Sequence, residues 1–350
     1  MTTISAALTQ AEILGSEASC ERFMLAVCVG YEVTCRIGRE LGFEAYDRGF
    51  HNTATAGIFG SVAALAVLRQ LPAETIEMAF GLAGSKAAGS MQYLDNGSWN
   101  KRLHPGFAVH DAFMCVSLAE AGVVGATKII EGKMGFLQAY SPKQDKKLDR
   151  IVADLGKEWV WLSSSLKPYP ACRMTHTFIE MAGNFHTSRR SDVDDITNIK
   201  LKMSHSSYLL VGQPTPNKVH PLNNIDAQFS VYFQVANALL HGSDTGIQAY
   251  QKLRDRNITR LCDLITVEAD PTMKGFSGVM AVIWAGGEVD TAQLDFPLGE
   301  TQHPFTRDKV EAKFRSLVVP VFGESKASKV LRLVDGLEKG SIGELLLLLQ

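Results

Sequence analysis

The chain has 350 residues, which is enough for one large domain or two of ordinary size. Hydrophobic residues make up 46% of the chain and charged residues 21%, a balance that indicates a globular protein and excludes a disordered or fibrous one. The formal net charge is -2, so the overall charge gives no support to a nucleic-acid partner.

The N-terminus carries no signal for export. It has no basic run followed by an apolar block, and the longest apolar stretch, residues 57–68, is too short to span a bilayer as a helix. We therefore expect no membrane partner and a cytoplasmic protein, or a mitochondrial one if a further segment precedes Met1. The six cysteines are scattered and form no Cys-x-x-Cys pair, which favours reduced thiols over disulfides or a zinc site.

The first half of the chain has the periodicity of a helical bundle. Apolar residues recur at helical spacing, with many Ala and Gly between them, over residues 23–42, 53–71, 72–89, 106–122 and 144–155. Pro72 stands at a helix start, where proline is tolerated. We expect these helices to pack closely through their small residues.

The periodicity changes after Trp161. In "ITNIKLKMS", residues 196–204, Ile199, Leu201 and Met203 share one face of a predicted strand. Further on, "VMAVIWAGGEVDTAQLDF", residues 279–296, predicts a hairpin that turns at Gly286 and Gly287. The middle of the chain is therefore predicted to mix helices with a sheet.

Helical periodicity returns after Pro297 and runs from Arg307 to the C-terminus. The predicted fold is mainly α with an inserted α+β domain. A large helical domain is formed by both chain ends, residues 1–164 and 297–350, and the smaller α+β domain by residues 165–296. The leucine run at residues 345–349 is expected to be the buried face of a terminal helix.

Three turns place cations and imidazoles at predicted helix starts. His51 precedes one helix, while Lys101, Arg102 and His104 precede a later one. A third group consists of Lys167, Arg173 and His176. Cations at a helix N-terminus are unfavourable because the helix dipole is positive there, unless an anion binds. Together the three turns predict a site for a polyanionic ligand, although each residue taken alone is better explained as a solvated or structural side chain.

Other catalytic motifs are weak or absent in the sequence. "GLAGSKAAG", residues 81–89, lies in a helical pattern and lacks the strand that precedes a phosphate-binding loop. There is no Gly-x-Ser-x-Gly nucleophile elbow. There is no His-Glu-x-x-His zinc helix either, so we expect no metal.

Several segments resemble the MmgE/PrpD family, which includes 2-methylcitrate dehydratase and cis-aconitate decarboxylase. The similarity covers nearly the whole chain and rests on "GFHNTATAGIFGSVAALAVLRQL", "GSKAAGSMQYLDNGSWNKRLHPGFAVHDA", "EGKMGF", "LKPYPACRMTH" and "DAQFSVYF", in that order. The resemblance implies a helical domain built from both chain ends, an α+β domain between them, and a homodimer. This agrees with the change of periodicity described above.

For chemistry, the resemblance implies a lyase acting on a citrate-derived tricarboxylic acid without a metal or an organic cofactor. His51 matches the family's active-site histidine, and Lys101 and Lys167 match its two lysines. The lysines would hold carboxylates while the imidazole moves a proton. Arg102, His104, Arg173 and His176 are the further candidates for binding the substrate. Dehydration of an alkylcitrate and decarboxylation of an aconitate are both consistent with these residue roles.

Two departures from the family pattern lead to an alternative to the lyase function. Family members carry an earlier segment with an active-site Asp and His, and this chain begins after that position. The family has a tyrosine three positions after the serine of "AQFS". Here that position is Phe233, and Tyr232 beside it would take the place of the tyrosine only after a change of register. The alternative is a truncated, catalytically weak homologue that serves as a dimer partner or ligand-binding subunit.

Overall fold

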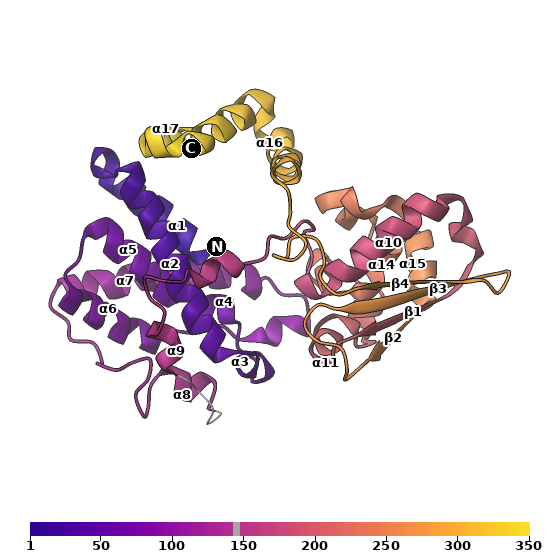
Figure 1. Ribbon diagram of the computed structural model, residues 1–350, viewed down its shortest axis with the longest axis horizontal. Helices are drawn as coiled ribbons and strands as arrows, with labels where there is room; N and C mark the ends of the chain where they lie inside the picture. The colour runs from indigo at the N-terminus through magenta and orange to yellow at the C-terminus, as the bar shows by residue number, and fades with distance from the viewer. Residues whose placement is uncertain (143–147) are drawn as a thin grey trace. The chain divides into compact units, whose positions relative to one another are not determined.

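The computed structural model describes residues 1–142 and 148–350, apart from the side chains of residues 190 and 191. It forms two compact units, which are described separately (Figure 1). The first comprises Met1–Tyr93, Ser98–Leu162 and Val318–Gln350, and the second comprises Leu94–Gly97 and Ser163–Leu317. The first unit is helical, while the second combines helices with one small sheet, so the predicted fold class is confirmed.

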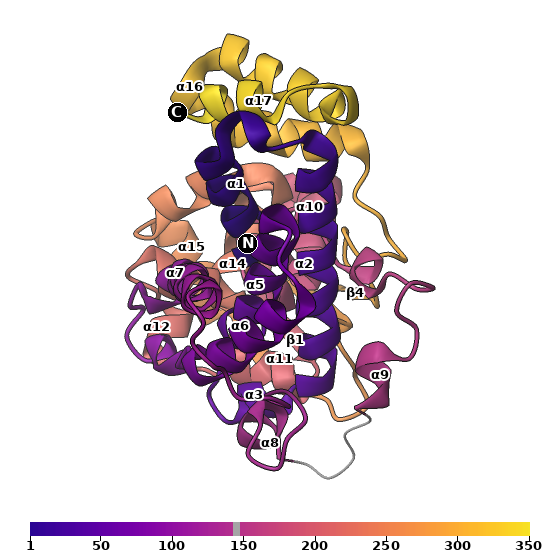
Figure 2. The same ribbon diagram turned by 90° about the vertical axis from the view of Figure 1, so that its left-hand side faces the viewer.

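The first unit is built from the early helices and the C-terminal ones (Figure 2). The early helices are α1 (Thr2–Leu14), α2 (Cys20–Leu41), α3 (Glu44–Asp47), α4 (Asn52–Thr55), α5 (Gly57–Arg69), α6 (Ala73–Lys86), α7 (Asn100–Glu120), α8 (Phe136–Tyr140) and α9 (Asp149–Val152). The helices predicted over residues 23–42, 53–71 and 72–89 are confirmed as α2, α4 with α5, and α6.

Helix α7 begins earlier than the sequence predicted. It starts at Asn100 and contains Pro105, whereas the predicted start was Gly106. Proline has no N–H and cannot donate the hydrogen bond to the carbonyl four residues earlier. At Pro105 the lost bond is the one to the Lys101 carbonyl, and the residues of α7 before Pro105 keep their own bonding pattern. Lys101 and Arg102 therefore lie in the first turn of α7 rather than before it.

The predicted helix over residues 144–155 is only partly tested, since residues 143–147 lie outside the described part of the chain. In the part that is described, only α9 is helical and the chain then turns. The buried Arg36 of α2 holds this segment by donating to the carbonyls of Ile151 and Glu158, each at 2.9 Å. These backbone acceptors fix the segment, and Ile151 of α9 also packs against the apolar core.

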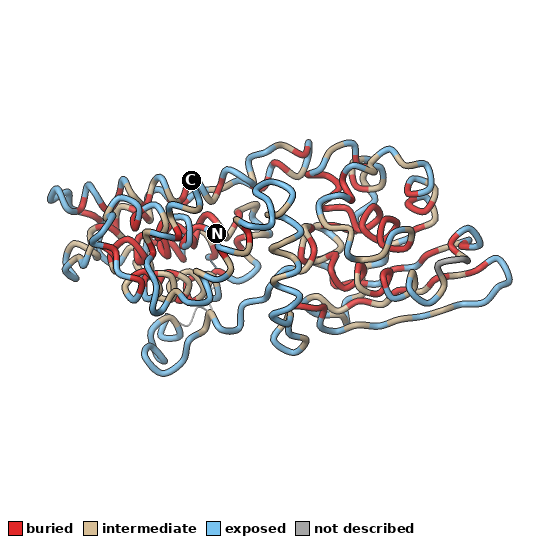
Figure 3. Tube along the Cα trace, turned by 90° about the horizontal axis from the view of Figure 1, so that it is seen from above, coloured by how far each residue is buried: buried red, intermediate tan, exposed pale blue. Residues whose placement is uncertain are grey.

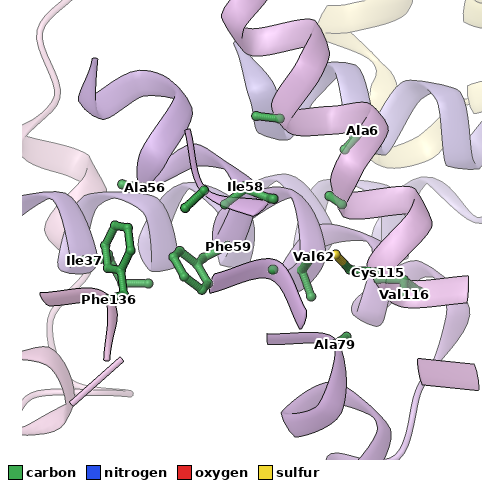
Figure 4. Close-up of a cluster of buried hydrophobic side chains, with 14 of the residues drawn as sticks. Ala6, Ile37, Ala56, Ile58, Phe59, Val62, Ala79, Cys115, Val116 and Phe136 are labelled. Carbon is green, nitrogen blue, oxygen red and sulfur yellow. The ribbon is translucent and has the colours of Figure 1, made fainter. Parts of the chain in front are cut away.

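Helix α5 forms the centre of the first unit, packed against α1, α2, α6 and α7. Nearly every residue of α5 is buried, and Figure 4 shows Ile58, Phe59 and Val62 of this helix in the apolar cluster. Close approach to α2 depends on small residues, because a Cβ atom on Gly60 would lie 2.4 Å from the Gly30 carbonyl oxygen. The Ala and Gly content noted in the sequence thus permits tight helix packing, as expected.

The second unit contains a four-stranded sheet in the order β2-β1-β3-β4. Strand β1 (Ile196–Met203) pairs in parallel with β2 (Ile265–Ala269) and antiparallel with β3 (Gly278–Trp284), which pairs antiparallel with β4 (Val289–Leu294). The hairpin predicted at residues 286 and 287 is confirmed, and Gly287 has a φ of 81° in the turn. The apolar face of β1 is buried, as its alternation predicted.

Helices cover the sheet of the second unit (Figure 1). The helices of this unit before residue 264 are α10 (His176–Arg189), α11 (His205–Ser207), α12 (Pro216–Val219), α13 (Asn224–Gln228), α14 (Val231–His241) and α15 (Arg256–Asp263). Helix α10 packs on β3, where the absence of a side chain at Gly278 makes room for the ring of Phe178. In both units the buried residues lie inside and the exposed ones outside (Figure 3).

The C-terminal helices are α16 (Arg307–Asp335) and α17 (Ile342–Leu349). Helix α16 contains Pro320 and breaks at Gly323, where φ is 79°. Its first part belongs to the second unit, so that unit runs on to Leu317, beyond the boundary drawn at residue 296 from the sequence. The reason is a contact within this unit, in which Lys313 Nζ donates to the Lys167 carbonyl at 2.6 Å.

The leucine run of α17 is only partly buried. Ile342 and Leu345 are covered, and α17 contacts α1, but Leu347 and Leu349 are exposed. The expectation that residues 345–349 form a buried face is therefore wrong for these two side chains, because α17 is covered along one narrow stripe only.

Candidate functional site

His51 stands directly before α4, as the sequence predicted, and is buried. The backbone N–H of His51 donates to the Gly89 carbonyl at 2.9 Å, and the backbone N–H of Met91 donates to the Gly49 carbonyl at 2.8 Å. Gly89 has a φ of 133°, and a Cβ atom there would lie 3.1 Å from the Cβ of Ala54 and 3.4 Å from Nδ1 of His104. The positive φ and the close neighbours both favour glycine at position 89. The hydrogen bond to Gly89 holds His51 against the second turn of α7.

His51 and His104 contact each other directly. Their Nδ1 atoms lie 3.0 Å apart, and both side chains are buried. A hydrogen bond at this distance requires one Nδ1 to donate and the other to accept. In the neutral pair, the donating ring has an acceptor at Nε2 and the accepting ring carries its hydrogen there. Burial and the charge of Lys101 lower the pKa of His104, which favours its neutral form.

Tyr93 and Lys101 complete this cluster, which we call the histidine cluster (His51, Tyr93, Lys101 and His104). The buried Tyr93 ring lies 6.2 Å from the ring of His51 and 6.0 Å from that of His104. The Lys101 ammonium lies 5.9 Å from the centroid of the Tyr93 ring. The first turn of α7 contains no acidic residue, so its positive dipole end and Lys101 together favour an anion.

A small pocket of about 180 Å³ adjoins the histidine cluster. His104 lines it, together with Gly89, Phe107 and the ion pair formed by Lys86 and Asp111, whose charged atoms are 3.4 Å apart. Its volume is below the range of about 300–1,000 Å³ that is usual for small-molecule sites. Arg102, the remaining candidate in this segment, is exposed.

The candidates of the second unit lie on the loop that starts at Lys167 and leads into α10, whose first residue is His176. Arg173 is buried and forms an ion pair with Glu300, in which Nε donates to Oε1 at 2.8 Å and Nη2 contacts the same oxygen. Its Nη1 donates to the Leu298 carbonyl at 3.0 Å. These partners satisfy the guanidinium, so the geometry favours a role in holding the loop over the substrate-binding role expected from the sequence.

His176 is fully buried beside Arg173. Arg173 Nη1 donates to His176 Nδ1 at 3.0 Å, so Nδ1 of His176 is an acceptor in this arrangement. Burial, followed by the charges of Arg173 and Lys167, sets the pKa of His176 well below its ordinary value. The imidazole is thus neutral near pH 7, and it too holds the loop in place.

Lys167 is the exposed cation of this loop, and its Nζ donates to the Ala171 carbonyl at 3.1 Å. The residues that follow it, Pro168 to Pro170, line a pocket of about 450 Å³, a volume in the range of small-molecule sites. Lys313 also lines this pocket, and burial and the charge of Lys167 lower its pKa. Sequence reasoning missed Lys313, because no local pattern connects it with Lys167.

Tyr232 does not offer its hydroxyl to an open site. The side chain is buried and its hydroxyl donates to the Gly212 carbonyl at 2.8 Å, while burial raises its pKa to about 12. Phe233 is buried and stacks on Tyr250 with a centroid distance of 6.0 Å. The substitution of Tyr232 for the family tyrosine therefore has no support in this geometry.

The sequence reasoning named His51, Lys101 and His104, which the structure brings together, but it missed Tyr93. The only available signal was that Tyr93 lies inside the family-like segment "GSKAAGSMQYLDNGSWNKRLHPGFAVHDA", residues 84–112. Among residues 1–142 and 148–350, no group of three His, Cys, Asp or Glu side chains is placed to hold a metal ion. Within the same residues, no helix is both long and apolar enough to cross a membrane.

Comparison with known proteins agrees with the resemblance found in the sequence. Residues 1–149 match the MmgE/PrpD N-terminal domain, and residues 169–339 match the MmgE/PrpD C-terminal domain. A cis-aconitate decarboxylase of Aspergillus terreus is 26% identical over 339 residues, which cover 90% of this chain and 68% of the relative. A cis-aconitate decarboxylase-like protein, oryM, of Aspergillus oryzae is 25% identical over 342 residues, which cover 93% of this chain and 70% of the relative. With both family domains matched in order, the chain belongs to the MmgE/PrpD family.

Proposed function

We propose that this protein is a lyase acting on a citrate-derived tricarboxylic acid, by decarboxylation of an aconitate or dehydration of an alkylcitrate, and that it works as a homodimer. The observation that carries the proposal is the contact between the two buried imidazoles beside Lys101. The names of the relatives favour decarboxylation.

The chemistry required by either reaction matches what the histidine cluster offers. Loss of carbon dioxide leaves an electron pair on carbon that must take up a proton. Dehydration needs one proton removed from carbon and another delivered to the leaving hydroxyl. A neutral pair of imidazoles that share one hydrogen contains one ring that accepts at Nε2 and one that donates there. His51 moves the proton in this proposal, and His104 sets its tautomer.

The cations supply the electrostatic part. Lys101 and Lys167 bind substrate carboxylates and stabilise negative charge as it develops, and Arg102 adds to the positive field beside Lys101. Arg173 and His176 act as positioning residues, since they fix the loop that carries Lys167. The alternative, a weak homologue that binds ligands without turning them over, is favoured by Phe233, which lacks the hydroxyl that the family pattern has at this place.

A binding experiment tests the anion site apart from catalysis. Citrate and cis-aconitate should raise the melting temperature more than acetate at equal concentration, because a ligand that binds only the folded state stabilises it by mass action. Lys101→Met should remove most of this difference. Lys133→Met, which changes an exposed lysine of the same unit, should leave it intact. Equal shifts in both variants would place the anion elsewhere.

Turnover then separates the lyase from the alternative. Incubation with cis-aconitate, citrate and 2-methylcitrate should yield carbon dioxide or an unsaturated acid, measured by gas release and by ultraviolet absorbance. Stabilisation by tricarboxylates without any product from the three substrates would favour the ligand-binding homologue and contradict the lyase.

A further inference from the structure

Polar side chains of the second unit hold the short segment that precedes α7. This segment, Leu94–Gly97, belongs to the second unit, whereas the chain before and after it belongs to the first. Nδ2 of Asn217, in α12, donates to the Leu94 carbonyl at 3.3 Å and to Oδ1 of Asp226 at 3.2 Å. The segment is thereby tied to α12 directly after Tyr93, whose ring is buried in the histidine cluster.

Asp226 is the centre of this attachment. The residue lies in α13, is only 7% exposed, and its Oδ2 accepts from Asn223 Nδ2 at 2.6 Å. Asn223 in turn caps α13, because its Oδ1 accepts from the backbone N–H of Asp226 at 2.9 Å. A buried carboxylate is costly without such donors, so the two amides and the carboxylate stabilise one another. We call Asn217, Asn223 and Asp226 the amide cage.

The other end of the segment lies against the same cage. Gly97 is buried and has a φ of 63°, a conformation that favours glycine. A Cβ atom at this position would lie 2.6 Å from Oδ1 of Asn223 and 2.9 Å from Oδ1 of Asp226. Both the backbone conformation and the close approach therefore require glycine, and the backbone at Gly97 is in direct contact with the amide cage.

The first turn of α7 depends on the residues that precede it. The Lys101 carbonyl receives no hydrogen bond from Pro105, which has no N–H. The next two N–H groups after Lys101 both donate backwards to the Trp99 carbonyl, at 2.9 Å and 3.4 Å. The turn that carries Lys101 is thus built on Trp99, two residues after Gly97, so that a displacement of Gly97 is passed on to Lys101.

We propose that the amide cage positions Tyr93 and Lys101 for substrate binding, by fixing the segment Leu94–Gly97 that lies between them. Asn217 and Asp226 are positioning residues in this proposal, because they act through the backbone of the segment. The two ends of the segment meet again in the histidine cluster, where the Lys101 ammonium lies 5.9 Å from the centroid of the Tyr93 ring. Lys101 enters as the carboxylate-binding cation of the proposed function, so the role of the cage in binding rests on that function.

A glycine substitution tests the role in binding. Gly97→Ala should lose most of the rise in melting temperature that citrate gives the unchanged protein, because the added Cβ atom pushes the segment away from the cage. Gly122→Ala is the matched control. Gly122 directly follows α7 and has a φ of 86°, but a Cβ atom there meets nothing within 4 Å. A full citrate effect in Gly97→Ala would overturn the proposal.

A milder variant answers the same question if Gly97→Ala fails to fold. Asn217→Ala deletes the hydrogen bonds to the Leu94 carbonyl and to Asp226 without adding an atom that clashes. It should reduce the citrate effect, whereas Asn224→Ala, which changes an exposed amide of α13, should preserve it. Equal citrate effects in these two variants would likewise contradict the positioning role.

A titration without ligand separates the positioning from the proposed function. Burial and the charge of Lys101 lower the pKa of His104, so a displaced Lys101 lowers it less. The pKa of His104, measured by NMR, should therefore be higher in Gly97→Ala or Asn217→Ala than in the unchanged protein, with Lys101→Met as the reference for complete loss of the charge. An unchanged pKa of His104 in both cage variants would overturn the positioning. A raised pKa in a protein that citrate does not stabilise would contradict the proposed function and leave the positioning intact.

Discussion

The histidine cluster of the first unit and the Lys167 loop of the second contain the same residue types in opposite electrostatic settings. In the cluster, two buried imidazoles contact each other beside Lys101. In the loop, Glu300 neutralises Arg173, which in turn donates to His176. A cation and a histidine at a helix start therefore do not define a role. The partner found far away in the sequence decides whether such a pair is suited to chemistry or to holding a loop.

The largest expected effect is on turnover, and it concerns the cluster. His51→Ala should lower the rate of product formation by about 10²–10⁴-fold, because a positioned proton-transfer group contributes about that much. His220→Ala is the control, since His220 is exposed and lies outside the histidine cluster. The assay is ultraviolet absorbance with cis-aconitate. An unchanged rate in His51→Ala would remove this residue from the mechanism.

The next effect is on stability, and it concerns the loop. Arg173→Met should lower the free energy of unfolding by about 3–5 kcal/mol, because the Glu300 carboxylate, whose side chain is only 12% exposed, loses its charged partner. Arg307→Met removes an exposed ion pair with Glu311 and should cost about 0–1 kcal/mol. Urea denaturation measures both. Equal costs in the two variants would show that Arg173 does not hold the loop.

A smaller effect is expected on the pH dependence of stability. The pKa of His176 is lowered in the folded protein, while in the unfolded chain it is about 6.5. Below that pH the unfolded chain takes up a proton that the folded protein does not, so stability falls as the pH falls. The contribution of His176 is at most about 1.4 kcal/mol per pH unit. His176→Gln should reduce this slope between pH 6.5 and pH 5, whereas His110→Gln should preserve it.

Fold class was predictable because it depends on periodicities that lie within single elements. The alternation of Ile199, Leu201 and Met203 predicted β1, and the small residues around Gly60 predicted close helix packing. The start of α7 was missed because the predicted helix began only at Gly106, after Pro105, although a proline in an early turn costs the helix only one hydrogen bond.

The site was predictable only as a set of cations and imidazoles. The contact of His51 with His104 joins residues 53 positions apart, and the contact of Arg173 with Glu300 joins residues 127 positions apart. No local pattern carries either pairing, since both arise from packing between separate elements. This is why Arg173 was expected to bind substrate, whereas its position favours holding the loop.

The shared hydrogen between His51 and His104 makes the two rings a single spectroscopic unit. Because one Nδ1 donates to the other, a change of tautomer in one ring forces the opposite change in its neighbour. The ring nitrogens of both residues should then shift together in nitrogen-15 NMR spectra, so that a label on either histidine would report the state of both.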